Sequence, residues 1–134
     1  MFTVTAIFWL AATFNVASGF QICKQPPGVE ERVFPNDLPI GLINAIKDKF
    51  GEIVAPGEKF DSSDKVVTGK NRRAIFVWMR ERRWVIATEH GGLGYNNPVF
   101  AFEVSADGLE AKLVAEAIVL RTDSLCGTAV RLIE

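Results

Sequence analysis

The 134-residue chain has only one histidine and two cysteines. A structural zinc site usually takes four cysteine or histidine ligands, so these counts argue against a metal centre. The two cysteines also form no Cys-x-x-Cys motif, which argues against a thioredoxin-like redox pair. We therefore expect neither a metal nor another cofactor.

Net charge is also small, because 15 Lys and Arg against 16 Asp and Glu give a formal charge of -1 at pH 7. The whole chain therefore lacks the strongly basic character of nucleic-acid-binding domains. Basic residues nevertheless gather between residues 70 and 83: Lys70, Arg72, Arg73, Arg80, Arg82 and Arg83. A strand between the two arginine groups would hold them about 20 Å apart at ~3.3 Å per residue. They would not form one patch, and we do not expect a nucleic-acid partner.

The N-terminal segment lacks charge: residues 2–14 are uncharged, and the small residues Ala17, Ser18 and Gly19 follow. This pattern predicts a signal peptide over residues 1–19, cleaved before Phe20, and a periplasmic or secreted protein. The usual Lys or Arg near Met1 is missing, so an uncleaved anchor and a soluble N-terminal strand or helix are the alternatives. The apolar stretch is shorter than the roughly 20 residues of a membrane helix, and no stable span is expected after cleavage.

The two cysteines, Cys23 and Cys126, lie near the two ends of the mature chain. In an oxidising compartment they predict one disulfide that ties the termini together. Residues 20–35 then form an extended lead-in, and residues 36–134 form a single domain.

A helix is predicted over residues 38–50, because Leu42, Ile43, Ile46 and Phe50 recur at helical spacing. Asn36 or Asp37 is the expected N-cap, with Pro39 in the first turn, and Gly51 is the expected stop. The apolar side of this helix requires a sheet to pack on.

A β-hairpin is predicted over residues 74–79 and 84–88, around the charged turn at residues 80–83. A two-residue loop and a four-residue loop give the same register, and the lack of Asn-Gly or Asp-Gly favours the longer loop. The register places Met79 opposite Trp84, Val77 opposite Ile86 and Ile75 opposite Thr88. Both faces are apolar, so we expect the hairpin in the middle of a sheet that is covered on both sides.

Further strands are predicted over residues 99–104 and 112–120, with shorter ones near residues 53–54 and 65–68. The last long strand should place Leu113, Ala115, Ala117 and Val119 on one side. Alanines recur on one face of the sheet (Ala87, Ala101, Ala115 and Ala117), and we expect the helix at 38–50 on that face.

Residues 124–133 favour a short closing helix capped by Thr122 or Asp123, with a terminal strand as the alternative. The sum is an α+β fold in which one N-terminal helix packs on an antiparallel β-meander of about four or five strands, with a short C-terminal helix. The order of elements resembles cystatin-like folds, nuclear transport factor 2-like folds and the helix-plus-sheet units of secreted β-lactamase inhibitor proteins. The resemblance is one of element order and implies no function.

The best candidate site lies where the second hairpin strand runs into a glycine-rich loop. His90 could act as a general base oriented by Glu89 or Tyr95. The loop could equally contact a ligand or protein partner, through His90, Gly91, Gly92, Gly94, Tyr95 and Asn96. Its spacing does not match a phosphate-binding motif.

A second candidate surface is the basic turn formed by Arg80, Arg82 and Arg83. Such a turn could bind an anionic glycan, a lipid head group or an acidic protein surface. The sequence therefore predicts a small exported binding module, inhibitor-like in size, for an unidentified protein or small ligand. The alternatives are a small enzyme that uses His90 and a structural cell-envelope component with an uncleaved N-terminal anchor.

Overall fold

The computed structural model describes residues 23–62, 71–92, 95–120 and 124–134. The predicted signal peptide, the strand near 65–68, Gly94 and the caps Thr122 and Asp123 lie outside these ranges. The elements are β1 (Glu30–Arg32), α1 (Ile40–Phe50), β2 (Arg72–Arg80), β3 (Arg83–His90), β4 (Asn97–Val104), β5 (Ala111–Val119) and α2 (Leu125–Ile133).

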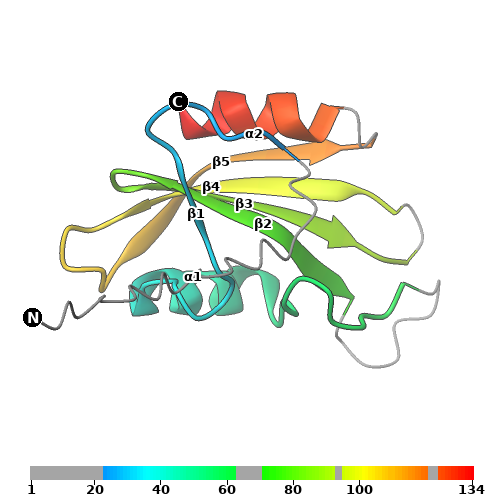
Figure 1. The fold of residues 1–134 in the computed structure, drawn as a ribbon. Helices are drawn as coiled ribbons and strands as arrows, with labels where there is room; N and C mark the ends of the chain where they lie inside the picture. The colour runs from blue at the N-terminus through cyan, green and yellow to red at the C-terminus, as the bar shows by residue number, and fades with distance from the viewer. Residues whose placement is uncertain (1–22, 63–70, 93–94, 121–123) are drawn as a thin grey trace, which may run out of the picture.

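The five strands form one antiparallel sheet in the order β1-β2-β3-β4-β5. Figure 1 shows α1 on one face of this sheet and α2 on the other. The α+β class, the β-meander and the short C-terminal helix are therefore confirmed. One detail differs: α1 is not strictly N-terminal, because β1 precedes it and pairs with the outer side of β2.

The first helix begins two residues later than predicted, and its N-cap is Pro39. Capping by Asn36 or Asp37 is therefore wrong. The Asp37 carboxylate instead accepts a hydrogen bond from the backbone N–H of Val33 (2.9 Å), which stabilises the preceding turn. The helix ends at Gly51 as predicted, where a φ of 72° is a conformation that glycine adopts easily.

The predicted register of the central hairpin holds next to the turn, where Met79 pairs with Trp84 and Val77 with Ile86. The loop is shorter than expected, because Arg80 pairs with Arg83, leaving a two-residue turn. Glu81 takes a φ of 55° in that turn, so no Asn-Gly pair was needed.

Farther along the hairpin the predicted pairing of Ile75 with Thr88 is wrong. A β-bulge between Ala74 and Phe76 places Ala74 opposite Thr88. A similar irregularity in the pairing of β4 with β5 leaves Val114 without a partner residue. Leu113 therefore packs on one face of the sheet and Ala115 on the other, and the single-sided arrangement predicted for β5 is wrong.

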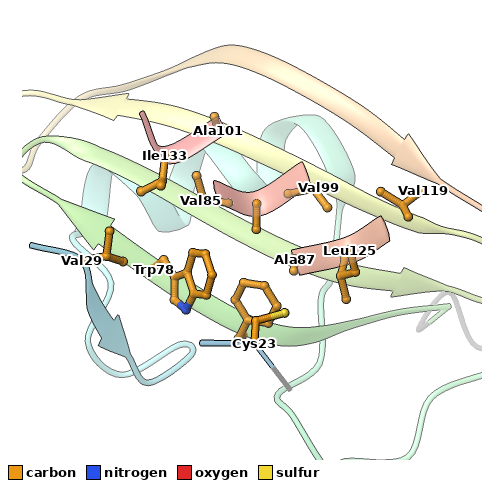
Figure 2. Packing of buried hydrophobic residues seen from close by; sticks show 12 residues of the cluster. Cys23, Val29, Trp78, Val85, Ala87, Val99, Ala101, Val119, Leu125 and Ile133 are labelled. Atoms are coloured by element: carbon orange, nitrogen blue, oxygen red, sulfur yellow. The ribbon is translucent and has the colours of Figure 1, made fainter. Parts of the chain in front are cut away.

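The two faces of the sheet carry two separate cores. On the α1 side, Leu42 and Ile46 pack with Ile86 and the phenylalanines of β4. On the opposite side, α2 packs on the alanine face, as Figure 2 shows for Ala87, Ala101, Leu125 and Ile133. The expectation that the helix at 38–50 covers the alanines is therefore wrong. Small sheet residues leave room for α2 to approach, and Ala129 of that helix is fully buried there.

The predicted disulfide joins Cys23 to Cys126, with 5.3 Å between the two Cα atoms. Cys23 lies in the core on the α2 side, which also contains Trp78 (Figure 2). The bond thus fixes the segment before β1 to the first turn of α2. Among the described residues, no helix is long and apolar enough to cross a membrane.

Candidate functional site

The candidate residues gather at the end of the sheet where β2 begins and β3 ends. Arg72 pairs with His90 there, and Arg73 pairs with Glu89. Successive strand residues point to opposite faces, so Glu89 and His90 project on opposite sides of the sheet. The structure therefore forms two clusters at this end, and Glu89 is not the residue that contacts the His90 ring.

The first cluster, which we call the Tyr95 cluster, consists of Tyr95, Glu89, Arg73 and Phe60. The Tyr95 hydroxyl donates to Glu89 Oε1 at 2.9 Å. Arg73 donates from Nε to Glu89 Oε2 at 2.9 Å, and its Nη2 lies 2.8 Å from the same oxygen. Both carboxylate oxygens of Glu89 are therefore engaged, one by the tyrosine and one by the arginine.

Arg73 is itself fixed by the connection between α1 and β2. Its Nη1 donates to the backbone carbonyl of Glu58 at 2.9 Å. Its guanidinium carbon lies 4.3 Å from the centroid of the Phe60 ring, at cation–π distance. A planar guanidinium with these contacts has little rotational freedom, so the cluster holds Glu89 in one position.

Half of the Tyr95 residue remains accessible to solvent, while its hydroxyl is hydrogen-bonded to Glu89. Partial burial and the hydrogen bond to Glu89 raise the pKa of the Tyr95 phenol above its ordinary value. The phenol therefore stays protonated at neutral pH and remains a donor to Glu89.

The second cluster lies on the α1 face and contains His90, Asn71 and Arg72. The Asn71 amide nitrogen lies 3.0 Å from His90 Nε2. An amide N–H can only donate, so Nε2 accepts and the proton of the neutral ring lies on Nδ1. The Arg72 guanidinium lies over the Phe50 and Phe100 rings, at 5.2 and 5.4 Å.

Burial and the nearby Arg72 charge lower the pKa of His90 below the 6.5 of a free imidazole. Burial also lowers the pKa of Arg72, against an opposing effect of Glu116. A neutral His90 has the protonation state that a general base requires. Its Nε2 lone pair is already occupied by Asn71, however, so this nitrogen cannot accept a substrate proton without breaking that contact.

We expect His90 to titrate below 6.5, and because the chain has one histidine, a single imidazole signal reports it. The folded protein disfavours the charged ring, so His90 contributes stability that is present above pH 6.5 and is lost as the pH falls from there through the folded pKa. The measurement is an NMR pH titration of the imidazole signal. Arg72→Met should raise the pKa while leaving it below 6.5, and a wild-type value at or above 6.5 would contradict the burial argument.

The loop glycines hold the connection against the end of β3. A Cβ on Gly91 would lie 2.5 Å from the Asp61 carbonyl oxygen, so only glycine fits this close approach. Gly92 has a φ of 98°, and its N–H donates to the Ser62 carbonyl at 3.3 Å. Asn96 closes the loop through backbone hydrogen bonds with His90. A role of these residues in binding remains a prediction.

The basic turn lies at the opposite end of the hairpin. Arg80 and Arg82 are exposed there, and Arg83 donates to Glu103 (3.1 Å) and to the Leu132 carbonyl (3.2 Å). Arg83 therefore ties the C-terminal end of α2 to the sheet. The structure does not bring Arg80, Arg82 and Arg83 to the glycine-rich loop, so the two predicted binding surfaces are separate.

Arg73 was considered only as a member of the basic cluster at residues 70–83, and neither Phe60 nor Asn71 was predicted to belong to the site. The predicted hairpin register would place Arg73 opposite His90, and the β-bulge between Ala74 and Phe76 shifts it opposite Glu89 instead. Phe60 and Asn71 gave no signal in the sequence, because the connection between α1 and β2 has no periodic pattern.

The fold and these clusters define a two-helix α+β domain with a half-exposed tyrosine, hydrogen-bonded to Glu89, at one end of its sheet. Comparison of the chain with protein-family models, with curated proteins and with solved structures finds no match. Across the described ranges, no group of three or more His, Cys, Asp or Glu side chains could hold a metal ion.

Proposed function

We propose that this chain is a small exported binding protein that recognises another protein through the surface around Tyr95. The observation that carries the proposal is the half-exposed Tyr95 ring held by Glu89, which is in turn held by Arg73. Tyrosine is enriched among the residues that dominate protein–protein binding energy, because it buries a large area with few rotatable bonds.

Preorganisation strengthens this interpretation. A side chain that is already fixed loses little conformational entropy when a partner covers it. Glu89 is central, because it contacts both Tyr95 and Arg73 and its side chain is only 16% exposed. Arg73 in turn connects the cluster to Glu58 and Phe60, so the tyrosine surface extends onto the neighbouring connection.

Export is proposed from the uncharged N-terminal segment and agrees with the Cys23–Cys126 disulfide, a bond that persists in oxidising compartments. A disulfide-stapled domain of this size with one rigid surface suits an inhibitor-like role. The catalytic alternative predicts that His90→Gln abolishes turnover, whereas the binding proposal predicts that partner binding survives this change.

The test uses the protein immobilised to capture partners from its host's exported fraction, followed by affinity measurement with the captured protein. Tyr95→Ala should weaken binding by about 30-fold or more, the range of a hot-spot residue. Glu89→Gln should weaken it less, since the ring remains but loses its charged acceptor. Leu109→Ala is the matched control, because Leu109 is 62% exposed at the opposite end of the sheet and should change the affinity by less than about twofold.

A captured partner that binds Tyr95→Ala as tightly as the wild-type chain would contradict the proposal. Tyr95→Phe separates the two contributions of the side chain, because it keeps the ring and removes the hydrogen bond to Glu89. We expect Tyr95→Phe to fall between the wild type and Tyr95→Ala.

A further inference from the structure

A separate hollow lies beside α1, between this helix and the chain segments that precede and follow it. We infer that it binds a small molecule with an aliphatic body and a single carboxylate. The hollow, here called the α1 pocket, has a volume of about 770 Å³. Its floor is formed by Phe34, Leu38, Ile43, Ile46 and Ile53. This inference does not depend on the Tyr95 surface, which involves other elements.

The floor of the α1 pocket fits an aliphatic ligand. Phe34, Leu38, Ile46 and Ile53 are buried members of the core on the α1 side, so they are held in place without a ligand. Ligand pockets generally have volumes of about 300–1,000 Å³, apolar walls and a few polar groups. The α1 pocket has this size and this kind of wall, and a preformed floor needs no rearrangement on binding.

The rim determines the charge of the ligand. Its exposed polar side chains are Asn36, Lys47 and Glu52. Glu52 already interacts with another group of the protein. Lys47 lines the pocket, is exposed, and forms no ion pair with another described residue. An anionic head group would pair with Lys47 and could accept a hydrogen bond from the Asn36 amide.

The opposite preference also has a physical basis, so the test includes it. Lys47 lies in the last turn of α1, and the carbonyl end of a helix favours cations. A pocket dominated by these carbonyls would prefer an amine, whereas a pocket dominated by Lys47 prefers a carboxylate. Three ligands with the same eight-carbon body separate these cases: octanoate, 1-octanol and octylammonium.

The experiment is titration calorimetry of the full chain with each ligand at pH 7. We expect octanoate to bind at least about fivefold more tightly than 1-octanol, the size of a good exposed charge pair, and octylammonium to bind most weakly. Lys47→Met should reduce octanoate affinity to that of 1-octanol. Lys49→Met is the matched control, because Lys49 lies on the same helix outside the pocket and should leave the affinity unchanged.

Ile43→Trp tests the location, because the larger side chain should fill the floor and reduce the affinity for octanoate and 1-octanol alike. Thermal unfolding checks that this variant folds, and the exposed Lys47→Met variant carries the test if it does not. The inference is overturned by equal or tighter binding of octylammonium, by unchanged octanoate affinity in Lys47→Met, or by no octanoate binding at millimolar concentration.

Discussion

Reduction of the Cys23–Cys126 disulfide is expected to lower the free energy of unfolding by about 4 to 5 kcal/mol, the chain-entropy value for a loop of about 100 residues. The two cysteines are separated by 103 positions, so the bond removes a large part of the conformational freedom of the unfolded chain. It also holds α2, a nine-residue helix that could not persist alone in water.

The measurement is thermal unfolding with and without a thiol reductant. The midpoint should fall by about 15 °C or more on reduction, since 1 kcal/mol corresponds to about 4 °C in a domain of this size. The double variant Cys23→Ala/Cys126→Ala should unfold at the lower temperature and should not respond to reductant. A wild-type midpoint that is the same with and without reductant would contradict the stabilising role of the bond.

Hydrogen exchange measures which part of the chain the disulfide stabilises. Cys126 lies in the first turn of α2, and α2 packs on the sheet through Leu125, Ala129 and Ile133. Reduction should therefore speed amide exchange in α2 more than in α1, because α1 packs on the other face and carries no disulfide. Equal acceleration in both helices would show that the bond acts only through the unfolded state.

The register of the central hairpin could be predicted because the charged turn at residues 80–83 fixes where the chain reverses. Side chains alternate between the two faces of a strand, so few pairings are then left. The pairings of Met79 with Trp84 and Val77 with Ile86 follow from the turn outward. The bulges near Ile75 and Val114 could not be predicted in the same way. Both interrupt runs of apolar residues that would be acceptable on either face, so the sequence carries no penalty for the extra residue.

The faces covered by the two helices were assigned wrongly for a related reason. Both faces of β3 and β4 are apolar, so hydrophobicity alone cannot say which helix covers which face. The alanine face accepts α2 because Ala129 lets the helix approach, while the face with Phe100 and Phe102 takes the larger side chains of α1. Side-chain volume on both partners decides this packing, and the sequence pattern of one strand does not show it.

The sequence predicted where the candidate site lies but not which of its side chains contact one another. Strand alternation already implies that Glu89 and His90 point to opposite faces. The contact between Tyr95 and Glu89 joins residues six positions apart in the chain. Gly91, whose lack of a Cβ lets the Asp61 carbonyl pack against it, brings Asp61 to the end of β3. Such a long-range contact leaves no local sequence signal.

Close approach at a glycine also underlies the second large effect that we expect. Gly41→Ala should lower the free energy of unfolding by about 2 kcal/mol, as overpacking in a well-packed site does. A Cβ on Gly41 would lie 2.4 Å from the Leu109 carbonyl carbon and 2.5 Å from the Glu110 nitrogen. These are backbone atoms of the β4–β5 turn, so no side-chain rotation can relieve the clash. The Gly41 N–H also donates to the Gly108 carbonyl at 2.9 Å, and the shift would strain this contact.

Gly127→Ala is the matched control, because Gly127 also lies inside a helix but nothing lies within 4 Å of an added Cβ there. Alanine should raise the free energy of unfolding at that position by about 0.5 to 1 kcal/mol through its higher helix propensity. Denaturant unfolding of both variants measures the two effects, which should have opposite signs. If Gly41→Ala were also stabilising, helix propensity would outweigh the contact, and α1 would not be held against the β4–β5 turn as closely as these distances require.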